Sequence, residues 1–141
     1  WFCESDMKAF ETADGGYQID IKGRTMVLTI KGVMDVEVAL RLLLEAKLLL
    51  IDLPHEHWAS LLDLTEWGLH PPEIIEFVRE FQVWAEENGQ LAEAAVINKS
   101  VLKVMVRNSL LEGTRKTVHQ EYFDNKNGAI EWLRILSLYE D

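Results

Sequence analysis

The sequence predicts an α/β protein: one compact domain with a mixed sheet of about five strands flanked by about four helices. Two alternating apolar segments near the N-terminus, separated by a short loop that contains glycine, are typical of an antiparallel hairpin. After them, segments with helical periodicity alternate with short apolar segments. The resulting order, ββαβαβαβα with right-handed crossovers, adds a parallel βαβ core to the N-terminal hairpin.

The N-terminal part divides into an arm and a hairpin. Residues 1–16 show no clear period and end in Ala-Asp-Gly-Gly, so we expect a flexible arm there and the domain itself over residues 17–141. Residues 17–21 and 26–31 alternate and are rich in strand-favouring types, and residues 22–25 supply the loop.

A long apolar helix should follow the hairpin. Asp35 is a suitable N-cap, and Glu37 in the first turn suits the helix dipole. The helix should end near Ile51, because Pro54 lies just beyond. Apart from Lys47, its polar residues fall four apart on one narrow stripe, formed by Glu37, Arg41 and Glu45.

Residues 58–64 are apolar on both faces, which predicts a central strand. The sequence Pro-Pro-Glu at 71–73 should open the next helix, and Asn88-Gly89 should end it. A short buried strand is expected at 94–97.

The C-terminal third should contribute two more helices and one strand. Ser100 is expected to cap a helix over residues 101–112, and residues 116–122 to form the last strand. Asp124 should cap the final helix, whose apolar face would hold Ala129, Trp132, Leu133 and Leu136.

Composition excludes several classes of function. The net charge of −10 argues against binding to nucleic acid or to an anionic membrane surface. No apolar run reaches the roughly 18–20 residues that span a bilayer, and the first residues do not resemble a signal peptide. The single cysteine, Cys3, cannot form an internal disulfide, so we expect a reducing, cytoplasmic location.

Four stretches carry a resemblance to a known family: MVLTIKGVMD, HWASLLDLTEWGLHPPEI, AEAAVIN and EYFDNKNGAIEWL. In this order they resemble the SpoIIAA-like members of the STAS family (sulphate transporter and anti-sigma factor antagonist), whose fold is similar to CRAL-TRIO lipid-transfer domains. The resemblance runs over residues 17–138. It implies a regulatory or binding module more than an enzyme, since this fold hosts regulators, transporter tails and lipid-binding relatives.

The resemblance also implies a position for regulation. In the anti-sigma antagonists, a Ser or Thr at the start of the helix after the Asp-Leu strand is phosphorylated by a partner kinase. By position, that hydroxyl would fall at residues 69–72. This sequence has Leu69, His70, Pro71 and Pro72 there, so we expect the phosphorylation switch to be missing.

The same corner holds residues that could do chemistry. Thr65 could act as a nucleophile, with His70 as base and Asp63 orienting it. The two prolines remove N–H donors from the helix start, however, and Glu73 places a carboxylate where an oxyanion would sit. We therefore expect no enzyme here, with Asp63 and Thr65 satisfying turn backbone groups.

Trp67 and His70 are the better candidates for binding. Trp67 would be either an exposed anchor for a partner or a core residue lying over the helix start. The triplet His55-Glu56-His57 lacks a third ligand at a diagnostic spacing, so we expect neither a metal nor another cofactor.

The apolar helix from Leu40 to Ile51 allows three interpretations. It is buried in the core, it is a docking face that includes a homodimer contact, or it bounds a cavity for a lipid-like ligand together with Phe77, Phe81, Val104 and Leu111. Our leading hypothesis is a non-enzymatic STAS-type module that binds a protein partner through residues 67–73 and neighbouring helix faces. The alternative is a carrier or sensor of a small apolar ligand.

Overall fold

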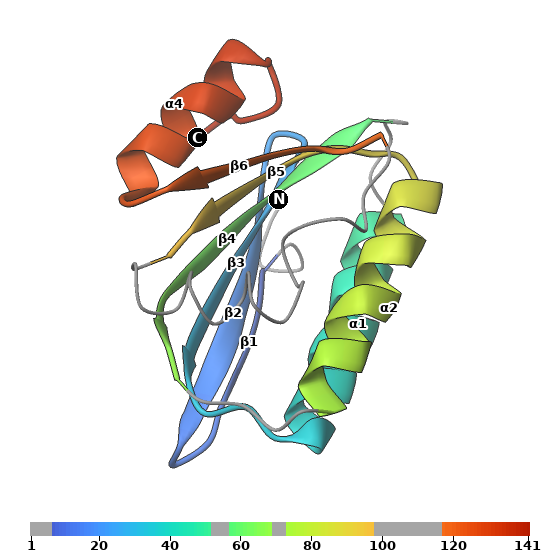
Figure 1. The fold of residues 1–141 in the computed structure, drawn as a ribbon, viewed down its shortest axis with the longest axis vertical. Coiled ribbons are helices and arrows are strands. Elements are labelled where there is room, and N and C mark those ends of the chain that lie inside the picture. Colours follow the sequence, from blue (N-terminus) through green and yellow to red (C-terminus); the bar gives the residue numbers. More distant parts are fainter. Residues whose placement is uncertain (1–6, 52–56, 69–72, 98–116) are drawn as a thin grey trace.

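The computed structural model describes residues 7–51, 57–68, 73–97 and 117–141, and a six-stranded sheet runs through them in the order β1-β2-β3-β4-β5-β6 (Figure 1). Strands β1 to β3 pair antiparallel, whereas β3 to β6 pair parallel. The predicted class, a mixed α/β sheet with an N-terminal antiparallel part, is confirmed. The strands are β1 (Met7–Glu11), β2 (Gly15–Lys22), β3 (Thr25–Gly32), β4 (Trp58–Trp67), β5 (Gln90–Val96) and β6 (His119–Phe123).

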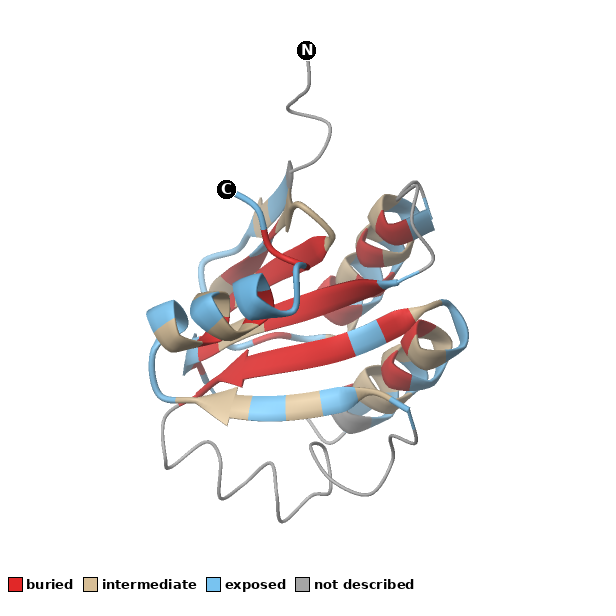
Figure 2. Cartoon of the chain, turned by 90° about the horizontal axis from the view of Figure 1, so that it is seen from above, coloured by how far each residue is buried: buried red, intermediate tan, exposed pale blue. Residues whose placement is uncertain are grey.

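Helices cover both faces of the sheet. Helices α1 (Val36–Ile51) and α2 (Glu73–Glu87) lie side by side over one face, and α4 (Lys126–Ile135) lies over the other (Figures 1 and 2). Helix α1 connects β3 to β4, and α2 connects β4 to β5. Each connection joins parallel neighbours, as in βαβ units.

The N-terminal arm is where the sequence prediction fails. Met7–Glu11 form β1 and pair along their whole length with β2, so a flexible arm is wrong from Met7 onward, and the sheet has six strands instead of five. The pairing brings the ring of Phe10 to 6.2 Å from that of Tyr17. Five residues with weak alternation become a strand because a neighbour supplies their backbone partners. Residues 1–6 lie outside the described part.

Helix α1 ends at Ile51 and α2 ends before Asn88-Gly89, as predicted, whereas α4 differs at both ends. Asp35 caps α1 as expected: its Oδ1 accepts a hydrogen bond from the Val38 N–H at 2.9 Å. Helix α4 is capped by Asn125 and not by Asp124, since Asn125 Oδ1 accepts from the Gly128 N–H at 2.8 Å. Leu136 is the C-cap of α4 and is exposed, so it does not belong to the packed face.

The described residues contain three helices. The helix predicted over residues 101–112, with its cap Ser100, lies outside them. Strand β4 is central, as its apolar faces predicted, and it extends beyond residue 64 to Trp67. Strand β5 begins at Gln90, four residues before the predicted start.

Two apolar cores lie on the two faces of the sheet. The larger one, under α1 and α2, includes the fully buried Ile19 and Met26 together with Trp58. The second, under α4, is formed by Leu61 and Leu133 with small residues of β5. Leu138, from the segment after α4, joins this second core. The two cores fix how α1 and α2 sit on the sheet, and the candidate sites depend on that placement.

Candidate functional site

The predicted corner begins inside β4. Thr65 is exposed, and its N–H and hydroxyl both donate to Asp63 Oδ1, at 3.3 and 2.8 Å. The carboxylate of Asp63 therefore binds a local backbone group and a neighbouring hydroxyl, in the manner of an Asx turn. Both residues lie in β4: Asp63 falls within the strand predicted over residues 58–64, whereas Thr65 was expected in the turn after it.

Trp67 points into the protein. It is 6% exposed and belongs to the core under α1 and α2, so of the two interpretations the core residue is correct and the exposed anchor is wrong. The cause is an irregularity in the sheet: Thr29 pairs with Asp63 and Lys31 with Glu66, which gives β4 one residue more than β3. Such a bulge reverses the alternation of side chains. Trp67 thereby joins Leu64 on the covered face.

The rest of the predicted turn is only partly described. Glu73 is exposed at the first position of α2, whereas His70 and both prolines lie outside the described residues. His57 is exposed, and its neighbours His55 and Glu56 also fall outside. Within the described ranges, no group of three His, Cys, Asp or Glu side chains is placed to hold a metal ion.

The outer face of α1 is apolar. Leu40, Leu44, Leu48 and Ile51 are between 44% and 67% exposed, and we call these four residues the α1 stripe. They follow one another at intervals of three and four residues, which places them along one side of the helix. The opposite side of α1 is buried against the sheet and α2 through Val38, Ala39, Leu43, Ala46 and Leu50. The helix thus has apolar residues on both its inner and outer faces.

A polar cluster holds α1 against the sheet edge. The Tyr17 hydroxyl of β2 donates to Glu45 Oε1, and Arg41 Nε donates to the same oxygen at 3.0 Å. The guanidinium of Arg41 also lies 4.3 Å from the ring centre of Phe10. Burial, and next the hydrogen bond to Glu45, raise the pKa of Tyr17 to about 12. The cluster adds polar contacts to the apolar packing of α1, and both leave the α1 stripe outward.

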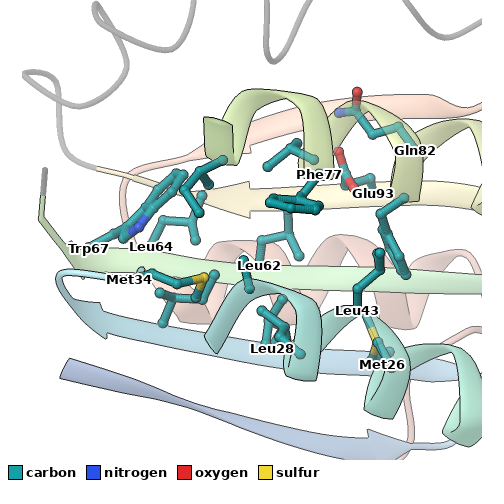
Figure 3. Close-up of a pocket in the computed structure, with 17 residues that line it drawn as sticks. Met26, Leu28, Met34, Leu43, Leu62, Leu64, Trp67, Phe77, Gln82 and Glu93 are labelled. Atoms are coloured by element: carbon teal, nitrogen blue, oxygen red, sulfur yellow. The ribbon is translucent and has the colours of Figure 1, made fainter. Parts of the chain in front are cut away.

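An apolar cavity of about 100 Å³ lies between the sheet and the α1–α2 layer. Figure 3 shows Trp67, Leu64 and Met34 toward one end, with Glu93 and Gln82 toward the other. The remaining described residues of its wall are apolar side chains from β3, β4, α1 and α2. Its volume is below the roughly 300–1,000 Å³ of pockets that hold drug-sized ligands.

Glu93, which the sequence reasoning missed, belongs to a buried polar cluster. It is 4% exposed; its two carboxylate oxygens accept from Ser60 Oγ at 3.2 Å and from Gln120 Nε2 at 2.7 Å. Gln90 Nε2 in turn donates to Ser60 Oγ at 2.8 Å. A single glutamate within the apolar stretch of β5 was the available signal, but the strand was expected to begin after it.

Comparison with known proteins rests on structure alone, because no family model and no curated protein matches the sequence. An uncharacterized protein of the DUF3478 family with a SpoIIAA-like fold, from Shewanella loihica PV-4, superposes with a TM-score of 0.60 at 13% identity. The match covers 90% of this chain and 91% of that one. The chain has a SpoIIAA-like fold.

A second neighbour of the SpoIIAA-like chain is an anti-sigma factor antagonist from Mycobacterium paratuberculosis, with a TM-score of 0.58 and 13% identity. This match covers 95% of the present chain and 99% of the neighbour. The resemblance to SpoIIAA-like STAS domains is confirmed at the level of the fold, whereas neither structure supports a likeness to CRAL-TRIO domains. The helices that the structure describes fall short of the length and hydropathy that a bilayer-spanning helix requires.

Proposed function

We propose that the chain is a non-enzymatic regulatory module of the STAS type, which binds a protein partner through the α1 stripe. The observation that carries the proposal is the exposure of four large aliphatic side chains on one face of a helix. Such a patch, bordered by charged groups, is typical of protein interaction sites. Glu37 and Arg41, both exposed on α1, provide that border.

The structural neighbour described as an anti-sigma factor antagonist supports a regulatory role. The corner after β4 supports a non-enzymatic one, because the Thr65 hydroxyl is bonded to Asp63 and the next helix opens with two prolines and Glu73. Residues 69–72 contain no hydroxyl, so the module would act without the phosphorylation switch that the resemblance implies. A cytoplasmic location remains our prediction from Cys3.

The partner surface differs from the one the sequence suggested. Trp67 is buried and serves the core, so residues 67–73 no longer offer an aromatic anchor. The α1 stripe takes that role, and a second copy of the chain is the alternative partner for it. Two stripes packed together would form an isologous contact.

The test is the double variant Leu44→Glu, Leu48→Glu, with Ile135→Glu as matched control. Ile135 is 73% exposed and lies on α4, which covers the opposite face of the sheet. We expect cross-linking in cells, followed by mass spectrometry, to recover the same partner with the wild type and the control. The double variant should lose that partner, because anchor residues each contribute about 2 kcal/mol or more.

All three proteins should keep their circular dichroism spectra, since the substituted residues are exposed. Light scattering separates the two kinds of partner: a dimer that only the double variant abolishes identifies a second copy. A double variant that retains every cross-linked partner and the oligomeric state of the wild type would contradict the proposal.

A further inference from the structure

The cavity under α1 and α2 has the size of a small organic molecule. Its volume is about 100 Å³, whereas an engineered apolar cavity of about 150 Å³ holds benzene. Scaled from the six carbons of benzene, an occupant would have about four or five non-hydrogen atoms. A lipid chain is too large, so the lipid-like ligand considered from the sequence does not fit.

The side chains of the cavity wall indicate which chemical class of ligand fits. Met26, Leu28 and Leu43 present apolar surface, and of the described lining residues Glu93 alone is ionisable. Both oxygens of Glu93 accept hydrogen bonds, from Ser60 and Gln120, so this carboxyl group offers a ligand acceptors and matches a donor better than another carboxylate. The wall therefore favours an apolar body with a donor group and disfavours a carboxylate such as a short fatty acid.

The glutamate is held in place before any ligand arrives. Its carboxylate is bonded to Ser60 of β4 and to Gln120 of β6, so three neighbouring strands fix its position. Gln82, from α2, also lines this end of the cavity and is buried (Figure 3). Groups fixed in this way lose little freedom when they bind.

From these observations we infer that the cavity is a binding site for a small aliphatic amine or alcohol, whose donor group faces Glu93 and whose chain lies against Leu43 and Met26. The inference does not depend on the protein partner proposed above. Because α1 forms both the cavity wall and the α1 stripe, the two sites are the inner and outer faces of one helix.

A series of compounds matched at five non-hydrogen atoms tests the inference: butylamine, butan-1-ol and propionate, each titrated into the whole protein and followed by methyl NMR. We expect the methyl signals of Met26 and Leu43 to shift with the amine and the alcohol. Leu133, in the core on the other face of the sheet, should not respond. Propionate should leave all three methyl signals unchanged.

Two variants locate the binding. Glu93→Gln replaces the carboxyl group by an amide of the same shape. It should lower the affinity for butylamine about fivefold to tenfold and the affinity for butan-1-ol by less than about twofold. Ala46→Leu should fill the cavity from α1 and abolish the binding of both compounds. Glu121→Gln is the matched control, since Glu121 lies exposed on β6, and it should bind like the wild type.

Two results would overturn the inference: no response of Met26 and Leu43 to either donor compound, or propionate binding as tightly as butylamine. Both are read on the wild-type protein, so the inference can fail even if a variant does not fold. Binding that survives Ala46→Leu in a folded variant would also refute it, because the ligand would then lie elsewhere.

Discussion

The segment after α4 turns back across the sheet, and Leu138 anchors it to the hairpin of β2 and β3. The carbonyl oxygen of Leu138 accepts hydrogen bonds from the Arg24 N–H at 2.9 Å and from Thr25 Oγ1 at 2.7 Å. Its side chain is 1% exposed in the core under α4. The contribution of this anchor to stability can be divided between one hydrogen bond and one side chain.

Thr25→Val removes the hydroxyl while keeping the shape of a fully buried side chain. The Leu138 carbonyl retains the Arg24 N–H, so no acceptor is left unsatisfied and the free energy of unfolding should fall by only about 1 kcal/mol. Leu138→Ala opens a cavity and should cost about 3 kcal/mol. In a chain of this size, the melting temperature should fall by roughly 2–4 °C and 6–12 °C respectively.

Urea unfolding followed by tryptophan fluorescence measures both losses, and a thermal scan by circular dichroism checks them. Leu136→Ala is the matched control, because Leu136 lies two residues away and is exposed; its loss should be far smaller than that of Leu138→Ala. If Thr25→Val cost as much as Leu138→Ala, or if Leu136→Ala did, the anchor would not be built as described.

Two further predictions concern a helix cap and an alkaline titration. Asn125→Ala should lower the free energy of unfolding, measured by urea denaturation, by about 1 kcal/mol, because Asn125 makes the capping hydrogen bond. Asp124→Ala should lower it much less, and equal losses would contradict the assignment of the cap to Asn125. The Tyr17→Phe variant lacks the hydrogen bond to Glu45, so this variant should be less stable than the wild type at neutral pH. The wild type holds the Tyr17 proton up to a pKa of about 12, against about 10 when unfolded. Its extra stability is therefore complete below pH 10 and disappears as the pH rises through 12, and a gap between the two proteins that stays constant over this range would contradict the assignment.

Local sequence signals located most of the elements correctly. Asp35 caps α1 as its position before an apolar helix indicated, and the apolar faces of residues 58–64 predicted a central strand. These features depend on residues close together in the chain. The resemblance to SpoIIAA-like domains rested on the order of these elements and on a few short motifs, and the structural neighbours confirm that fold.

The candidate sites were decided by contacts between distant segments. One extra residue in β4 relative to β3 directs the Trp67 side chain toward the core, and no local sequence pattern marks that bulge. Glu93 became a buried acceptor because Ser60 and Gln120 lie beside it on adjacent strands. Each of these depends on register, which is a property of two strands together.

Helix α1 shows most clearly which features follow from the sequence and which depend on the tertiary structure. The sequence by itself determined that residues 36–51 form a helix with apolar groups on nearly every side. Which of those groups would face water was decided by packing on the sheet and on α2, which buries one side of α1, and by the contacts of Glu45 with Tyr17 and of Arg41 with Phe10. Leu40, Leu44, Leu48 and Ile51 face outward for that reason, since a helix one layer above a sheet can bury only one side.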